Sequence, residues 1–276
     1  MLKNKKIAVI GAGHIGSAII GGILKAKLIS PKSVTASRRS AEALDELKKR
    51  FGIQTTPDNR RAVKGADILI LAVKPQGAPA LLEEIAPVVR EDQLLISVMA
   101  GVTTERINKL LGKPNPIVRA MPNTPALVDA GATPLSKGAH AKDADLAIAE
   151  TIFKAVGIVE IVPESLMDAV TGLSGSGPVY IYMVIEAPID GGVKMGIPRT
   201  VARRLAAQTV LGAAKLVIET GKHPAILKDE VTTPGGTAIA AVHMLESKGL
   251  RNVLIEAVAT AARRSQELSR PGDAGS

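Results

Sequence analysis

The stretch from Asp229 to Thr237, D-E-V-T-T-P-G-G-T, has the residue types of an anion-binding helix start. Thr232 or Thr233 suits the capping position, and Pro234 suits the first helical position, where a missing N–H costs nothing. Each glycine inside a helix costs about 0.8–1 kcal/mol relative to alanine, so a helix built for stability alone would not carry the two that follow. We expect a small anion such as a carboxylate to approach the bare N–H groups there. A plain capped helix that happens to carry glycines is the alternative.

A second glycine pattern lies near the N-terminus. The apolar run I-A-V-I at 7–10 predicts a buried strand, and G-A-G-H-I-G at 11–16 follows it directly. A helical apolar pattern then runs to about Lys27. A G-x-G-x-x-G motif between a strand and a helix is typical of dinucleotide binding, with glycines for the tight turn, the pyrophosphate and the helix packing. A bare tight turn is the alternative.

The residues after the next predicted strand indicate which dinucleotide binds. NAD sites usually place an acidic residue about 20 positions past the glycines, where it holds the ribose 2′-hydroxyl. No Asp or Glu occurs between Ser17 and Ala41, and the strand instead runs into Ser37, Arg38 and Arg39. Two guanidinium groups and a hydroxyl suit a 2′-phosphate, so we expect NADPH to be preferred and NADH to be possible. Solvated charges at the start of a helix are the alternative.

Three more loops follow predicted strands, and doubly wound folds bind ligands at these carboxyl ends. They are A-V-K-P at 72–75, V-M-A-G at 98–101 and R-A-M-P-N-T-P at 119–125. Lys74 would meet a ribose hydroxyl or the pyrophosphate. The small Ala100 and Gly101 would let a nicotinamide ring lie against the backbone. Turns that are merely rich in helix-breaking residues are the alternative.

The composition agrees with a soluble enzyme and is compatible with the cytoplasmic location that we expect. The 276 residues contain no cysteine, which removes disulfides, thiol nucleophiles and cysteine-based metal sites, and we expect no metal. We expect no signal peptide and no membrane span, because the apolar runs are short and interrupted. The net charge of +9 raises nucleic acid as a partner, but the basic residues are scattered and only two Tyr and two Phe are present to stack bases. We therefore expect no nucleic-acid partner.

The order of the elements predicts an α/β chain with a Rossmann-type, doubly wound parallel sheet over 1–162 and an all-α domain over 163–276. Before Pro163, short apolar strands alternate with helical patterns, and after it the strand signal fades. The expected strands are 5–10, 33–37, 67–73, 94–99, 116–120, about 131–135 and 157–162. The expected helices are 14–27, 40–51, 76–88, 103–111 and 142–155, then 164–172, 177–195, 198–220, 224–230, 234–247 and 249–269. The tail from Arg270 is expected to be disordered, and Pro188 is expected to kink its helix.

Five motifs in this order and spacing resemble the pyrroline-5-carboxylate reductase family: G-A-G-H-I-G, L-A-V-K-P, R-A-M-P-N-T-P, G-L-S-G-S-G-P and D-E-V-T-T-P-G-G-T. The resemblance spans about Lys5 to Leu268. It implies NAD(P)H-dependent reduction of 1-pyrroline-5-carboxylate to L-proline, the last step of proline biosynthesis. It also implies a Rossmann domain followed by a helical domain through which two subunits interlock. The expected partners are a small-molecule substrate and a second copy of the chain, with higher oligomers of dimers also open.

The resemblance also assigns residues by position. The cofactor would meet Gly11, Ala12, Gly13, His14, Ile15, Gly16, Ser37, Arg38, Arg39, Asn59, Ala72, Val73, Lys74, Pro75, Met99, Ala100 and Gly101. The substrate would meet Glu164, Ser174, Gly175, Ser176, Thr233, Gly235, Gly236, Thr237 and Ala238, with Thr237 and Glu164 as candidate catalytic residues. Ala238 departs from the family, because many members carry a threonine hydroxyl there. Thr237 lies one position too early to be a simple substitute, so the proton donor stays open.

The chemistry of a cyclic imine explains why the chain shows no convincing catalytic histidine. A protonated imine is already an electrophile, so the enzyme needs mainly orientation and an anchor for the carboxylate. Glu164 would stabilise the positive nitrogen, or would merely favour a helix N-terminus. A hydroxy-acid dehydrogenase would place a lysine in the first long helix of the second domain, and 177–192 has none. A non-catalytic NADPH-binding regulator is a further alternative.

The helix expected over 178–195 is apolar on nearly all sides, so it must be buried on most of them. A domain of about 110 residues has little capacity to do this alone. The sequence therefore predicts an obligate homodimer formed through the second domain.

Overall fold

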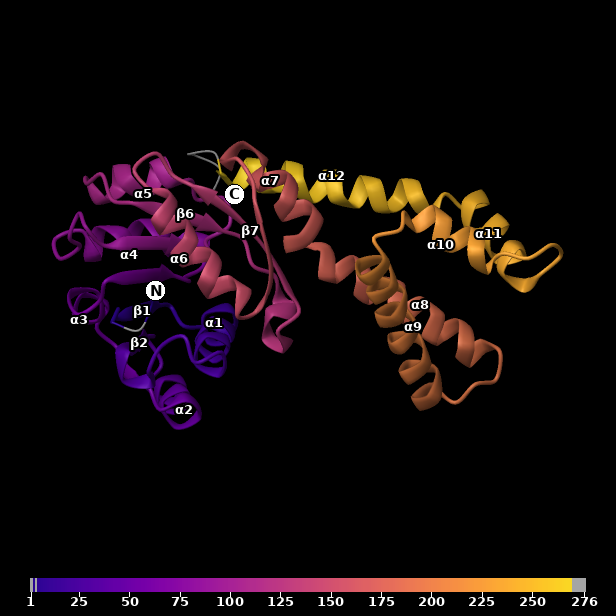
Figure 1. The fold of residues 1–276 in the computed structure, drawn as a ribbon, viewed down its shortest axis with the longest axis horizontal. Coiled ribbons are helices and arrows are strands. Elements are labelled where there is room, and N and C mark those ends of the chain that lie inside the picture. Colours follow the sequence, from indigo (N-terminus) through magenta and orange to yellow (C-terminus); the bar gives the residue numbers. More distant parts are fainter. Residues whose placement is uncertain (1, 3, 270–276) are drawn as a thin grey trace. The chain divides into compact units, whose positions relative to one another are not determined.

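The computed structural model describes residue 2 and residues 4–269, which form two compact units. The first unit combines the residues up to Ser176 with those from Ala259 onward, and the second spans Gly177–Val258. Figure 1 follows the chain through both. The sequence places the domain boundary at Pro163, whereas the compact units divide after Ser176, because Glu164 is hydrogen-bonded to Thr104 and Ser265 to Asp168 within the first unit. The tail expected to be disordered from Arg270 lies outside the described residues.

Within the described residues, the first unit holds one sheet of eight strands in the order β3-β2-β1-β4-β5-β6-β7-β8. The strands are β1 (Ile7–Ile10), β2 (Val34–Ser37), β3 (Gln54–Thr56), β4 (Ile68–Leu71), β5 (Leu94–Ser97), β6 (Ile117–Ala120), β7 (Gly131–Lys137) and β8 (Gly157–Ile161). The pairs from β3 to β6 are parallel. This order, which reverses its direction at β1, is the doubly wound arrangement predicted from the sequence.

Helices cover both faces of this sheet, and each face has its own hydrophobic core. One face packs against α1 (His14–Lys25), α2 (Ala41–Phe51) and α6 (Asp143–Lys154). The other face packs against α3 (Asn59–Lys64), α4 (Ala78–Ile85) and α5 (Thr104–Leu111). In β1, Val9 belongs to the first core while Ala8 and Ile10 belong to the second, because side chains alternate across a strand. The strands therefore read as continuous apolar runs, as a sheet buried on both faces requires.

Two details of the sheet differ from the sequence-based expectation. The sequence does not predict β3 or α3, which are short and polar. β7 pairs antiparallel with β6, whereas β8 runs parallel to β7. Between β6 and β7 the chain forms only a 3₁₀ helix, Thr124–Val128, and a parallel pair would need a longer crossover.

The segment after β8 is a continuous run of turns rather than a helix followed by a break at 173–176. A 3₁₀ turn (Glu164–Leu166) leads into α7 (Met167–Val170) and then into a π-helix (Thr171–Gly175). The amide of Ser176 donates to the carbonyl of Thr171 over 2.8 Å, which is the i to i−5 bond of a π-helix. π-Helical turns are uncommon and occur often at functional sites.

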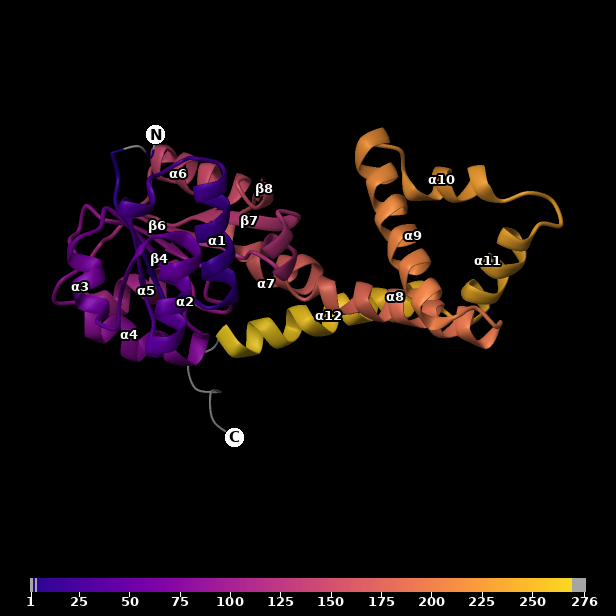
Figure 2. The ribbon, with the colours of Figure 1, turned by 90° about the horizontal axis from the view of Figure 1, so that it is seen from below.

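The second unit is helical, with α8 (Gly177–Lys194), α9 (Arg199–Thr220), α10 (Pro224–Val231) and α11 (Thr237–Ser247), and α12 (Leu250–Ser269) leads out of it. Pro188 lies inside α8, which stays a single helix. Figure 2 shows α9, α10 and α11 following one another around an open loop rather than stacking into a bundle. Ala202 is the only buried residue from Gly177 to Val258. Across the described residues, no helix combines the length and apolar character that crossing a membrane requires.

Candidate functional site

A groove of about 710 Å³ opens at the carboxyl ends of β1, β2 and β4. Eight of the residues predicted to contact the cofactor line it, namely Gly11, Gly13, Arg38, Arg39, Asn59, Ala72, Val73 and Lys74. Six further lining residues were not predicted: Ser40, Gln76, Gly77, Ala80, Leu81 and Glu84. Most of the six lie on or just before α4, which follows the K-P turn. The spacing of Ala80, Leu81 and Glu84 on one helical face was the signal available in the sequence.

Backbone contacts hold the glycine-rich turn against its neighbours. The amides of Gly11 and Ala12 both donate to the carbonyl of Ser37, at 3.0 and 3.1 Å. Gly11 has φ +79°, and a Cβ there would lie 2.5 Å from Cγ1 of Val73. Only glycine fits this approach, so the turn after β1 lies directly on the loop after β4.

Gly13 differs from Gly11, because the protein itself does not require glycine there. A Cβ at Gly13 would meet nothing closer than the carbonyl oxygen of Gly11, at 3.8 Å. Gly13 is also the N-cap of α1, and no side chain caps this helix. The amides of the first turn of α1 are thus free to bind a phosphate, and the space beside Gly13 lets the phosphate approach. These residues fit the pyrophosphate of a dinucleotide.

Ser37 and Asn59 are linked below the groove. Ser37 is fully buried, and its hydroxyl donates to Oδ1 of Asn59 over 2.7 Å. Nδ2 of Asn59 donates to the carboxylate of Glu84 over 2.9 Å. Ser37 does not line the groove, so its hydroxyl holds Asn59 in place. The two guanidinium groups of Arg38 and Arg39 do line it.

The other predicted cofactor residues lie around this groove. His14 borders a neighbouring hollow with Arg38 and Arg50. Ala12, Gly16 and Met99 are buried, and Ile15, Pro75, Ala100 and Gly101 are outside the groove lining. Gly101 has φ +69°, and a Cβ there would lie 3.2 Å from Oγ of Ser269. The last turn of α12 therefore lies against the loop predicted to meet the nicotinamide.

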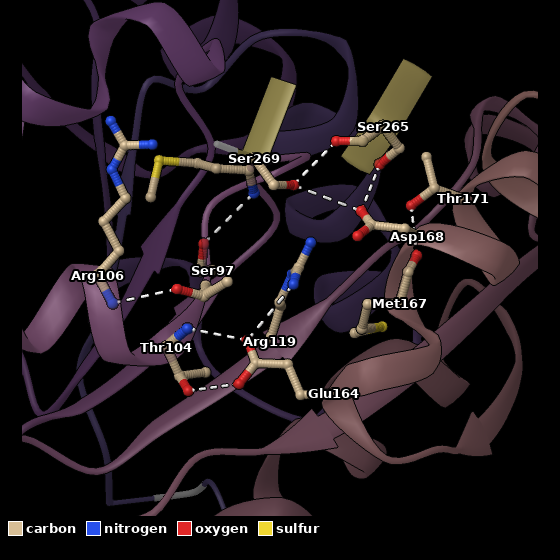
Figure 3. Close-up of polar contacts among 12 residues, drawn as sticks. Ser97, Thr104, Arg106, Arg119, Glu164, Met167, Asp168, Thr171, Ser265 and Ser269 are labelled. Atoms are coloured by element: carbon tan, nitrogen blue, oxygen red, sulfur yellow. Dashed lines mark hydrogen bonds and ion pairs between the residues drawn. The ribbon is translucent and has the colours of Figure 1, made fainter. Parts of the chain in front are cut away.

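Glu164 is held within the first unit, as Figure 3 shows. Its carboxylate accepts from the amide and the hydroxyl of Thr104, at 2.9 and 2.6 Å, and lies 3.4 Å from Nη1 of Arg119. Thr104 is the first residue of α5, so Glu164 caps the start of this helix and complements its dipole. The Arg119 side chain is only 4% exposed, and Glu164 supplies its counter-charge. The carboxylate thus has structural partners, and its side chain keeps 26% exposure.

A second polar contact fixes the end of α12, also visible in Figure 3. Oγ of Ser265 donates to the carboxylate of Asp168 over 2.6 Å, and Oγ of Ser269 lies 3.5 Å from the same oxygen. Ser265 is buried. Asp168, on α7, therefore holds the last turns of α12 beside the loop at 99–101.

The G-L-S-G-S-G motif forms the π-helix and is attached to the R-A-M-P-N motif. Nδ2 of Asn123 donates to the carbonyl of Ser174 over 3.0 Å. A Cβ at Gly175 would lie 3.1 Å from Cε of Met121. The hydroxyl of Ser174 donates back to the carbonyl of Val170 over 3.0 Å. The turn that contains Ser174, Gly175 and Ser176 is therefore fixed by contacts with Asn123 and Met121.

The turn at 233–238 belongs to the second unit, and the predicted helix start at Pro234 is wrong. Thr232 is the C-cap of α10, and α11 begins at Thr237 with Gly236 as its N-cap and no capping side chain. Gly235 has φ +69°, so it serves the turn. A Cβ at Gly236 would lie 2.4 Å from Oγ1 of Thr233. Both glycines lie before the helix and are required by the turn itself, so their presence does not by itself indicate a ligand.

No metal site is evident in the part of the chain that the structure describes. It holds no group of three or more His, Asp or Glu side chains arranged to bind a metal ion.

The fold and the groove define a Rossmann-type oxidoreductase that binds a nicotinamide dinucleotide. Residues 6–101 match the family described as "NADP oxidoreductase coenzyme F420-dependent", and residues 164–268 match "Pyrroline-5-carboxylate reductase dimerisation". The chain belongs to the pyrroline-5-carboxylate reductase family.

Similar proteins cover nearly all of this chain. The reductase of Methanosarcina acetivorans is 46% identical over 98% of this chain and 100% of its own length, and that of Escherichia coli is 41% identical over 97% and 99%. A solved reductase from Coxiella burnetii has a TM-score of 0.91 with 39% identity, covering 97% of this chain and 100% of that one. A Plasmodium falciparum pyrroline carboxylate reductase with NADP bound has a TM-score of 0.89 with 31% identity, covering 98% and 100%.

The contact between Asp168 and Ser265 can be tested by Asp168→Ala. Loss of a hydrogen bond to a charged acceptor should lower the free energy of unfolding by about 1.5–3 kcal/mol. It should also speed tryptic cleavage at Arg263 and Arg264 in α12, because the helix end loses its attachment. Urea denaturation and limited proteolysis measure the two effects. Asp45→Ala, at an exposed position on α2, is the control and should change neither. Equal cleavage rates in both variants would contradict this role for Asp168.

Proposed function

We propose that this chain catalyses the reduction of 1-pyrroline-5-carboxylate to L-proline with NADPH or NADH. The observation that carries the proposal is membership of the family over both units, joined to a groove that fits a dinucleotide. A nicotinamide dinucleotide held in this groove would supply the hydride for the carbon of the protonated imine, whose nitrogen becomes that of the amine. The protein then has no alkoxide to protonate, so orientation and charge complementarity account for most of its contribution.

The substrate carboxylate is proposed to bind at the start of α11. The amides of Thr237, Ala238 and Ile239 are in its first turn, and no side chain caps this helix. Thr233 and Gly236 belong to the turn before α11. Thr237, the first residue of this helix, carries a hydroxyl beside the proposed carboxylate site. Ser174, Gly175 and Ser176, on the π-helix, are also proposed as substrate-binding residues.

Glu164 is proposed to act on the substrate by its charge. Its carboxylate accepts two hydrogen bonds from Thr104 and lies beside Arg119, and these contacts fix its position in the first unit. Such an anion would favour the protonated imine over the neutral one. A structural cap for α5 is the alternative, and a Glu164→Gln variant with unchanged pH dependence of kcat/KM would favour it.

The activity is tested by oxidation of NADPH on addition of 1-pyrroline-5-carboxylate, followed at the nicotinamide absorbance, with proline identified as the product. Gly13→Glu should abolish the reaction and nucleotide binding while leaving the fold intact, because its Cβ would meet nothing closer than the Gly11 carbonyl oxygen at 3.8 Å and its charge is like that of the pyrophosphate. Gly65→Glu, also in open space but outside the groove, should retain activity. A parent chain that binds NADPH but forms no proline would contradict the proposal and favour a regulator or another dehydrogenase.

A preference for NADPH is part of the proposal, supported by the two guanidinium groups in the groove lining. Arg38→Ala should weaken NADPH binding by about 1–3 kcal/mol and NADH binding much less, since only NADPH carries the 2′-phosphate. Dissociation constants from fluorescence titration measure both. Lys49→Ala, at an exposed position on α2, is the control. An equal loss for the two nucleotides would mean that Arg38 does not bind the 2′-phosphate.

We propose that the chain works as a homodimer formed through the second unit. A unit with one buried residue and many exposed apolar side chains cannot be stabilised by its own core. Light scattering at micromolar concentration should give a dimer or a multiple of it. Met183 is 65% exposed within one chain, so we expect its side chain to be buried against the second copy. Met183→Asp should therefore shift the protein toward monomer, because it would bury a charge in the interface. Val128→Asp, at a 75% exposed position in the first unit, should leave the dimer intact. A stable, active monomer of the parent chain would contradict the proposal.

The cytoplasmic location expected from the sequence stays a prediction, which fractionation of the source cells would test.

A further inference from the structure

Glu84 contributes the single acidic side chain among the groove-lining residues. It projects from α4, and its carboxylate takes part in none of the ion pairs formed by the described residues. Arg60 contacts it only through the backbone, with Nε donating to the Glu84 carbonyl over 2.8 Å. A carboxylate without an ionic partner in this groove would repel a phosphate-rich ligand by its charge.

The hydrogen bonds of Glu84 determine how Asn59 is oriented. A carboxylate can only accept, so the side chain of Asn59 must turn Nδ2 toward Glu84, at 2.9 Å. Oδ1 then faces Ser37 and accepts its hydroxyl proton, at 2.7 Å. Oδ1 is thereby directed toward Ser37, and the second N–H of Nδ2 is the donor that Asn59 can still offer the groove. Asn59 is a donor in the groove because Glu84 makes it one.

This network lies where the adenosine ribose of a dinucleotide would bind. Ser37 ends β2, at the position about 20 residues past the glycines where NAD-binding proteins hold the 2′-hydroxyl. Asn59 is attached to Ser37, and Arg38 and Arg39 line the same groove. The ribose end therefore contains two cationic side chains, one oriented amide donor and one carboxylate.

We propose that Glu84 is a specificity-determining residue of the cofactor groove. It aims the Nδ2 donor of Asn59 at the ribose end and places a negative charge there. This charge disfavours a nucleotide with a 2′-phosphate relative to one with a 2′-hydroxyl, and so limits the preference that Arg38 and Arg39 create. The inference rests on the proposed function only in that a nicotinamide dinucleotide binds in this groove.

The effect should be measurable but moderate. A 2′-phosphate carries nearly two negative charges at neutral pH, whereas the 2′-hydroxyl carries none. In a half-exposed groove, a like charge several ångströms away costs on the order of tenfold in affinity after screening by solvent and salt. The neutral nucleotide end should be insensitive to the same charge.

The test is isothermal titration of the full-length parent and variants with NADP⁺ and NAD⁺, without any imine substrate. Glu84→Gln keeps an acceptor for Asn59 and removes the charge. The ratio of the NAD⁺ to the NADP⁺ dissociation constant should rise on the order of tenfold, with the NAD⁺ constant itself nearly unchanged. Glu83→Gln is the matched control, because Glu83 is the exposed neighbour on α4 and lies outside the groove lining. An unchanged ratio in Glu84→Gln, or equal gains for both nucleotides, would overturn the proposal.

A second variant separates charge from orientation. Glu84→Ala removes both the charge and the hydrogen-bond acceptor, so Asn59 is free to turn Oδ1 toward the groove. The ratio of the NAD⁺ to the NADP⁺ dissociation constant should then rise less than in Glu84→Gln. Identical ratios in the two variants would overturn the orienting role. A parent that binds both nucleotides but forms no proline would contradict the proposed reaction and leave this inference standing. A parent that binds neither nucleotide would overturn the inference.

Discussion

The close approach of three strand ends is the constraint on which the rest of the first unit depends. The turn after β1 donates two backbone hydrogen bonds to the carbonyl of Ser37 at the end of β2, and Gly11 lies on Val73 at the end of β4. These contacts use backbone atoms, so they leave no room for side-chain variation at Gly11. They also leave the amides at the start of α1 pointing into a groove instead of into the core. The conformation of this turn therefore follows from the packing of the sheet, so it would be preorganised for the dinucleotide pyrophosphate that we propose to bind there.

The two units solve the problem of burying apolar surface in different ways. The sheet of the first unit is covered on both faces, and its two cores contain most of the buried residues. In the second unit, Ala202 alone is buried, although α8 and α9 are rich in apolar residues. Helix α12 begins in the second unit and ends in the first. There Ser265 is hydrogen-bonded to Asp168. The loop at 99–101 is consequently in contact with the end of α12, a segment that is far away in the sequence.

Much of the architecture could be predicted because periodicity and glycine placement report local geometry. The strand order could not be read directly, and β3 and α3 were missed because polar runs of three and six residues carry no periodic signal. The helix start at Pro234 was wrong, because α11 begins at Thr237 and Gly235, with φ +69°, belongs to the turn before it. The hydrogen bond from the buried Ser37, a predicted cofactor residue, to Asn59 could not be predicted, because the two residues lie on separate elements. Glu84 was missed because an acidic residue on a helix normally indicates a solvated surface.

The sequence by itself determined the fold class, the dinucleotide-binding turn, the family and the apolar character of the helical unit. These properties depend on the order of residues within about one element, or on motifs kept at fixed spacing. The tertiary structure alone decided which polar groups meet: Glu164 with Thr104 and Arg119, Asp168 with Ser265, and Asn59 between Ser37 and Glu84. Hydrogen bonds are short and directional, so their partners follow from how separate elements pack, and no local pattern in the chain encodes them.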